Sequence, residues 1–92
     1  MPYAFHFSPT SMTEADYDEL VRRLEEAGAG KPPGRMYHVC YGSGDRLAIF
    51  DVWDATESFM AFGQTLIPIM REMGLTPADP EVVEVHNILV GD

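Results

Sequence analysis

The sequence predicts an α+β fold whose elements run in the order strand, helix, strand, strand, helix, strand. Four short segments are rich in aromatic and β-branched residues and alternate in the way typical of strands. Two segments between them carry apolar residues at spacings of three and four, the period of an amphipathic helix. The chain has 92 residues, of which 46% are hydrophobic and 23% charged, so we expect a single globular domain over residues 1–92.

The first strand is predicted over residues 3–7, where aromatic side chains take every second position and share one side. The first helix should begin near Thr13. One capping signature pairs Thr13 with Asp16, and another pairs Ser11 with Glu14. The apolar stripe of this helix consists of Tyr17, Leu20, Val21 and Leu24.

Residues 35–41 and 47–54 are predicted as the second and third strands, joined as a hairpin by the turn-forming residues 42–45. The third strand is apolar on both sides. One side carries Leu47, Ile49 and Trp53, and the other carries Ala48, Phe50 and Val52. Both faces of this strand therefore need to be covered.

The second helix is expected to start near Thr56, whose side chain would cap it. Pro68 should interrupt this helix, either as a kink or as the start of a fresh helical segment. The apolar stripe comprises Phe59, Phe62, Leu66, Met70 and Met73. The last strand is predicted over residues 82–90. This order of elements is the split β-α-β unit repeated twice, which is the ferredoxin-like arrangement.

Composition limits the partners and the cellular setting. Fifteen acidic and six basic residues give a formal charge of −9, which argues against nucleic acid and anionic membrane surfaces as partners. Cys40 is the only cysteine, so the chain cannot form an internal disulfide or a thiolate zinc site. The sequence carries neither a signal-peptide pattern nor an apolar run of membrane-spanning length. We therefore expect a cytoplasmic protein.

Much of the chain resembles a known superfamily. The likeness is carried by the run FDVWD at residues 50–54, then by Ser58, Phe59, Phe62, Leu66 and Pro68, and by the Val-rich last strand. These residues resemble the dimeric α/β-barrel superfamily, and within it the small uncharacterised relatives of antibiotic-biosynthesis monooxygenases. The resemblance implies a four-stranded antiparallel sheet with two helices on one face, and a homodimer in which two open sheet faces close into a barrel. A face as apolar as that of Leu47 and Ile49 favours the same dimer, because monomers rarely leave such a patch in water.

The resemblance also implies a function. Monooxygenase-type members of the superfamily oxidise aromatic, often polyketide-derived, compounds without metal or flavin. The leading hypothesis is a cofactor-independent protein that binds a small aromatic or polyketide-like molecule in a mostly apolar pocket between sheet and helices and oxygenates it. The alternative is a non-catalytic dimeric binding or interaction module. The residues alone do not decide whether the protein is an enzyme.

Three histidines are candidate functional residues, because imidazole is the usual proton shuttle near neutral pH. Alternation along the strands is expected to place His6, His38 and His86 on the sheet face opposite the helices, where they would approach one cavity in the dimer. His86 or His38 is predicted to accept the substrate proton. Their spacing carries no metal signature, so no metal site is expected. Haem or metal handling through these residues is a third alternative.

The other candidates would orient the substrate. Trp53 and Tyr37 offer flat apolar walls with polar tips, and His6 is grouped with them. Asn87 lies on an otherwise apolar strand face, so its amide must find a partner either in the backbone or in a pocket. For Trp53 the competing interpretation is packing in the core.

Overall fold

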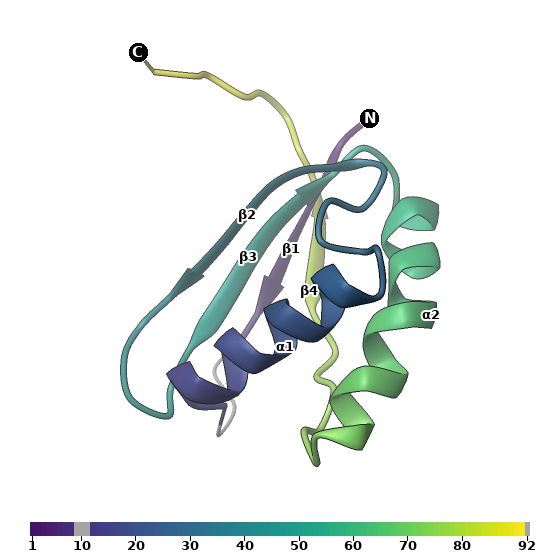
Figure 1. The fold of residues 1–92 in the computed structure, drawn as a ribbon. Coiled ribbons are helices and arrows are strands. Elements are labelled where there is room, and N and C mark those ends of the chain that lie inside the picture. The colour runs from purple at the N-terminus through teal and green to yellow at the C-terminus, as the bar shows by residue number, and fades with distance from the viewer. Residues whose placement is uncertain (9–11, 92) are drawn as a thin grey trace.

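The computed structural model describes residues 1–8 and 12–91 and has the predicted α+β fold (Figure 1). Its elements are β1 (Tyr3–Phe7), α1 (Glu14–Glu26), β2 (Arg35–Tyr41), β3 (Ala48–Trp53), α2 (Thr56–Glu72) and β4 (Glu81–Glu84). The strands form one antiparallel sheet of order β2-β3-β1-β4. Both helices cover the same face of this sheet (Figure 1). The ferredoxin-like prediction is therefore confirmed.

The start of α1 follows one of the two predicted capping signatures. The hydroxyl oxygen of Thr13 accepts a hydrogen bond from the backbone N–H of Asp16 at 3.0 Å. The Asp16 carboxylate accepts one from the backbone N–H of Thr13 at 3.1 Å. This reciprocal pair satisfies two donors that the first turn of a helix leaves free. Ser11, the other predicted start, lies outside the described residues.

The second helix begins at Thr56 as predicted, but Thr56 does not cap it. Ala55 is the N-cap residue and makes no side-chain cap bond, while the Thr56 hydroxyl donates to Glu57 at 2.7 Å. The helix runs through Pro68 to Glu72, so the fresh segment considered at Pro68 does not form. Residues on both sides of Pro68 pack against the core and hold the two halves of the helix. Within residues 1–8 and 12–91, neither helix is long and apolar enough to cross a membrane.

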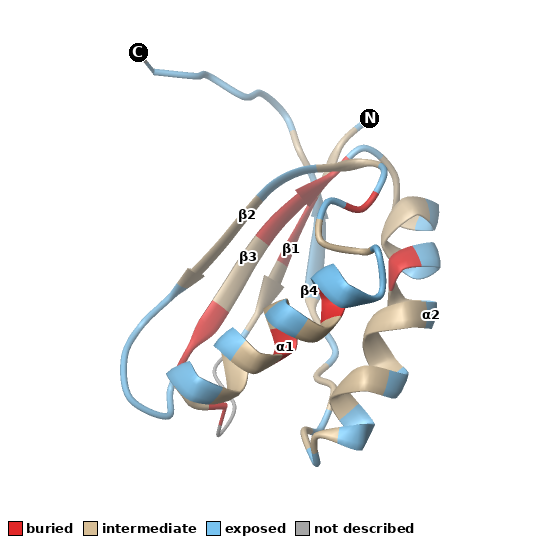
Figure 2. Cartoon of the chain, viewed as in Figure 1, coloured by how far each residue is buried: buried red, intermediate tan, exposed pale blue. Residues whose placement is uncertain are grey.

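The core lies between the sheet and the helices, where the buried positions of Figure 2 cluster on the strands and on the inner sides of α1 and α2. Trp53 is fully buried there. Its ring meets Phe59 edge-on, with ring centroids 5.6 Å apart, and lies 5.4 Å from the Phe62 ring. The core-packing interpretation of Trp53 is therefore confirmed.

The two faces of β3 have different surroundings, and the face expected to need a partner is the wrong one. Leu47, just before β3, is only 5% exposed, and Ile49 packs against the same helix-covered core. Because neighbouring strand residues point to opposite sides, the face away from the helices carries Ala48, Phe50 and Val52. Ala48 and Val52 are only 3% and 8% exposed, so the need for cover falls on the exposed side chains of the same face, Tyr37, Tyr41 and Val83. We call this second apolar face the open face.

The last strand is shorter than predicted. It ends at Glu84 and not at residue 90. Its partner β1 begins at Tyr3, which pairs with Glu84, and one further bond joins the Val85 N–H to the Pro2 carbonyl at 2.9 Å. Pairing stops there because the partner strand has run out. Residues 85–91 extend away from the sheet as a tail (Figure 1).

Candidate functional site

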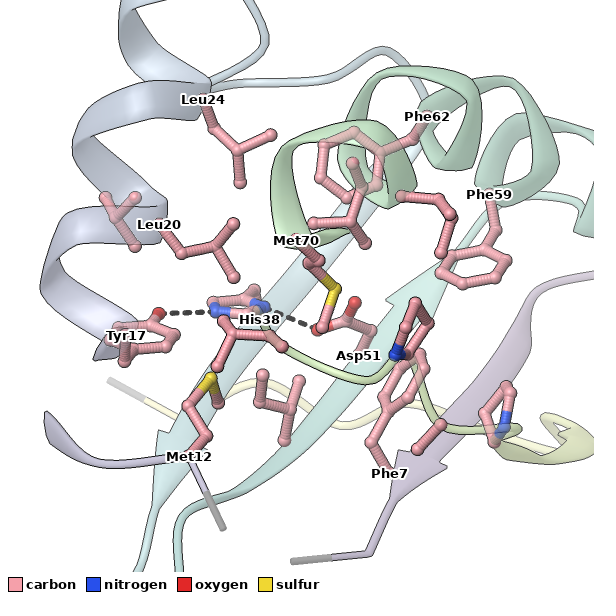
Figure 3. Close-up of a pocket in the computed structure, with 18 of the residues that line it drawn as sticks. Phe7, Met12, Tyr17, Leu20, Leu24, His38, Asp51, Phe59, Phe62 and Met70 are labelled. Carbon is pink, nitrogen blue, oxygen red and sulfur yellow. Dashed lines mark hydrogen bonds and ion pairs between the residues drawn. The ribbon is translucent and has the colours of Figure 1, made fainter. Parts of the chain in front are cut away.

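A cavity of about 430 Å³ lies between the helices and the sheet, within the size range of small-molecule sites (Figure 3). Both helices, β2, β3 and the loop before β4 contribute to its wall. Most of that wall is apolar and includes Leu20, Leu24, Ile49, Phe59, Phe62 and Met70. The cavity therefore suits a compact hydrophobic molecule.

Three polar side chains form a hydrogen-bonded chain in this apolar wall (Figure 3). Oδ1 of Asp51 lies 2.6 Å from Nδ1 of His38. Nε2 of the same imidazole lies 2.6 Å from the phenol oxygen of Tyr17. The other carboxylate oxygen of Asp51 accepts the indole N–H of Trp53 at 3.2 Å. We call the first three residues the Tyr17–His38–Asp51 relay.

The direction of the hydrogen bonds follows from the chemistry of the three groups. A carboxylate can only accept, so Nδ1 of His38 carries the proton that faces Asp51. In the neutral imidazole, Nε2 carries no proton and accepts the hydroxyl proton of Tyr17. Burial raises the pKa of Tyr17 above its ordinary value of 10.0, the charges of Cys40 and Asp51 act in the same direction, and Arg35 opposes them. Tyr17 therefore stays protonated near neutral pH.

Strand register brings the relay together. His38 on β2 and Asp51 on β3 are paired residues, and both face the helices. A bulge between Arg35 and Tyr37 adds one residue to β2. Simple alternation would put Arg35 on the face opposite His38, but the extra residue turns both side chains toward the pocket. The bulge thus gives the site its only positive side chain among the described residues that line it.

Two of the residues predicted from the sequence belong to this site. His38 lines the pocket and is the middle member of the relay. Its expected position opposite the helices is wrong, because Cys40 and His38 form the helix-facing set of β2. Trp53 lies behind the pocket wall, where it bonds to Asp51.

The other predicted residues lie outside the pocket. His6 is on the open face, where Nε2 lies 2.6 Å from the phenol oxygen of Tyr41. Tyr37 is at the bulge and is 59% exposed. His86 and Asn87 are on the exposed tail. Within one chain the three histidines therefore do not share a face.

Tyr17, Asp51 and Arg35 were not singled out from the sequence. A signal existed for Asp51, because a carboxylate inside an otherwise apolar strand must be paired when the strand is buried; it is 4% exposed. Tyr17 was indistinguishable from the other apolar residues of its helix stripe. In the part of the chain that the structure describes, no group of three or more His, Cys, Asp or Glu side chains is arranged to hold a metal ion.

Solved structures similar to this chain have the same fold. A candidate antibiotic biosynthesis monooxygenase from Chloroflexus aurantiacus is 24% identical, with a TM-score of 0.65 over 99% of this chain and 100% of that one. SnoaB, a cofactor-independent oxygenase from Streptomyces nogalater, is 15% identical, with a TM-score of 0.59 over 96% and 94%. A candidate antibiotic biosynthesis monooxygenase from Deinococcus radiodurans is 11% identical, with a TM-score of 0.62 over 100% and 99%. No protein-family model and no curated protein matches the chain. The fold is thus that of antibiotic-biosynthesis-monooxygenase-like proteins.

Proposed function

We propose that the protein binds a small aromatic or polyketide-like molecule in the pocket and removes a proton from it, as the first step of an oxygenation that needs no cofactor. The observation that carries this proposal is the Tyr17–His38–Asp51 relay, which sits in the wall of an otherwise apolar cavity. Buried acid and base groups converging on one pocket are typical of catalytic sites.

The relay supplies a route for the proton. A substrate hydroxyl next to Tyr17 would donate its proton to the phenol oxygen while the phenol proton passes to Nε2 of His38. The imidazolium that results is stabilised by Asp51, whose carboxylate already lies 2.6 Å away. Positioned acid–base groups of this kind accelerate reactions by about 10²- to 10⁴-fold.

Molecular oxygen is the oxidant in the proposed reaction. The ionised substrate passes one electron to O₂, and the resulting radical pair combines to form a carbon–oxygen bond. The imidazolium of His38 returns its proton to the peroxide, and the hydroperoxide then loses water, so that a hydroxyl-bearing ring with a C–H group and O₂ become a ring with two carbonyl groups and H₂O. The similarity to a cofactor-independent oxygenase supports this reaction class.

We also propose that two copies associate through their open faces. This face exposes large apolar side chains such as Tyr37, Tyr41 and Val83, each 44% or more exposed. Leu89 and Val90 on the tail are 89% and 90% exposed, although the tail has the alternation of a strand. A second copy would cover both features. In such a dimer we propose that His6, Tyr37, His86 and Asn87 meet in a shared cavity between the two copies, separate from the pocket that holds the relay.

Oxygen consumption with model dihydroxyaromatics tests the reaction. The wild-type chain should consume oxygen and substrate together under air and leave the substrate unchanged under anaerobic conditions. His38→Ala should lose at least about a hundredfold in rate. His86→Ala tests the other predicted proton acceptor. A larger loss of rate in His86→Ala than in His38→Ala would refute the role of the relay. Ligand binding without any oxygen uptake would support the alternative of a non-catalytic binding module.

A further inference from the structure

We propose that Arg35 forms an anion-binding subsite in the pocket, so that the ligand is an aromatic carboxylate. This inference rests on the proposed function only in that the same pocket receives the ligand. The evidence comes from the position of Arg35, from its lack of a carboxylate partner and from the charge of the whole chain.

The bulge in β2 and two contacts fix the position of Arg35. The side chain is partly buried and lines the cavity. Its guanidinium carbon lies 5.9 Å from the centroid of the Phe62 ring, and Nη2 donates to the Gly30 carbonyl at 3.1 Å. Contact with a ring face and one carbonyl holds the guanidinium in place but does not neutralise it.

Across the described residues, no carboxylate forms an ion pair with Arg35. Arg22 and Arg23, by contrast, both bind Glu19. Asp51 also lines the pocket, but its two oxygens are taken by His38 and Trp53. Asp79, the remaining lining carboxylate, is exposed in the loop before β4. The partly buried guanidinium of Arg35 therefore has no carboxylate partner among the described residues and is available to an anion bound in the cavity.

A carboxylate fits this position best. Guanidinium binds carboxylate through two parallel N–H···O bonds, and exclusion of water strengthens such charge-assisted bonds. The formal charge of −9 repels anions from most of the protein surface, so an anionic ligand requires a local cation. Tyr17 and Arg35 both line this pocket. One aromatic molecule with a hydroxyl at one end and a carboxylate at the other would reach both groups.

Calorimetric titration of the full chain at neutral pH and low salt tests the subsite with three probes of equal ring size. These probes are 2-naphthoate, its neutral analogue 2-naphthamide, and 2-naphthol. Naphthoate should bind wild type at least about tenfold more tightly than naphthamide. Arg35→Met should weaken naphthoate by roughly tenfold to a hundredfold while leaving naphthol nearly unchanged. Arg35→Lys keeps the positive charge but not the two parallel N–H donors of the guanidinium. Its affinity for naphthoate should lie between those of wild type and Arg35→Met.

Arg71→Met is the matched control, because Arg71 is an exposed arginine near the end of α2 that does not line the pocket. It should bind all three probes as wild type does. If Arg35→Met fails to fold, the comparison of naphthoate with naphthamide in wild type still decides the question. Naphthol binding without a preference for naphthoate would overturn the subsite and leave the proposed function standing. No binding of any probe would overturn both.

Discussion

Nδ1 of His38 lies 2.6 Å from Oδ1 of Asp51, its paired residue on the neighbouring strand. This short contact joins a titratable base to a carboxylate that is 4% exposed. A buried carboxylate is costly unless its partners are in place, and here the imidazole and the Trp53 indole supply them. The pair is therefore both a structural unit and the inner end of a proton path.

Asp51→Asn should reduce oxygen-dependent turnover by at least about a hundredfold, because an amide cannot stabilise the imidazolium that forms on His38. The amide oxygen can still accept the Trp53 N–H, so the fold should survive. Asp54→Asn is the matched control, since Asp54 lies at the surface and bonds to Ser58. Oxygen electrode rates and circular dichroism of both variants check the result. Equal activity in the two would contradict the relay.

Tyr17→Phe should slow turnover by about tenfold or more while ligand affinity changes little, because the variant loses a proton carrier but keeps the aromatic wall. Tyr41→Phe breaks the corresponding phenol–imidazole pair on the open face and serves as the control. Stopped-flow or steady-state rates, compared with calorimetric Kd values, separate the two effects. A loss confined to affinity would mean that Tyr17 only binds the ligand.

The raised pKa of Tyr17 also predicts how stability depends on pH. The unfolded chain ionises this phenol near its ordinary pKa of 10.0, whereas the folded chain ionises it only at higher pH. The contribution of Tyr17 to the free energy of unfolding is therefore complete below about pH 10. It is lost as the pH rises through the pKa that Tyr17 has in the folded chain. The urea midpoint should therefore fall more between about pH 9 and about pH 11 in wild type than in Tyr17→Phe. Identical falls would show that Tyr17 ionises alike in both states.

The features that could be predicted are those determined by residues close to one another in the sequence. Thr13 and Asp16 lie three positions apart, and their capping box formed as expected. The end of β4 is set by the start of its pairing partner β1, which is far away in the sequence. The alternation of residues 82–90 therefore could not predict it. The face of His38 was misassigned because Tyr37, Val39 and Tyr41 form an apolar set that lies on the open side. When both faces of a sheet are apolar, alternation identifies the two sets but not which one the helices cover.

Trp53→Phe distinguishes a positioning role for the indole from direct contact with substrate. The variant removes the N–H that Asp51 accepts and leaves space in the core, so the free energy of unfolding should fall by about 1–3 kcal/mol. Turnover should fall because the carboxylate is less well held, while substrate Kd should stay nearly constant, since Trp53 does not line the pocket. Urea unfolding and calorimetry measure these quantities. A large change in Kd with normal stability would support the original prediction that Trp53 contacts the substrate.

Val83→Lys should convert a dimer into a monomer without unfolding the chain. Val83 pairs with Ala4 on the open face and is 54% exposed within one chain, so a lysine there remains solvated in the monomer but would be buried without a partner in the dimer. Light scattering coupled to size exclusion should give twice the mass of one chain for wild type at tens of micromolar, and one chain for the variant.

Met60→Lys is the control for that experiment, because Met60 is a large apolar residue on α2 with 67% exposure and lies on the other side of the sheet. A dimer built through the open face should tolerate this change, since the helix surface stays in water. If Met60→Lys and Val83→Lys both dissociate the wild-type dimer, the contact uses another surface. If wild type is itself a stable monomer, the open face and the apolar tail are covered by something other than a second copy, and the predicted roles of His6, His86 and Asn87 in a shared cavity fail with it.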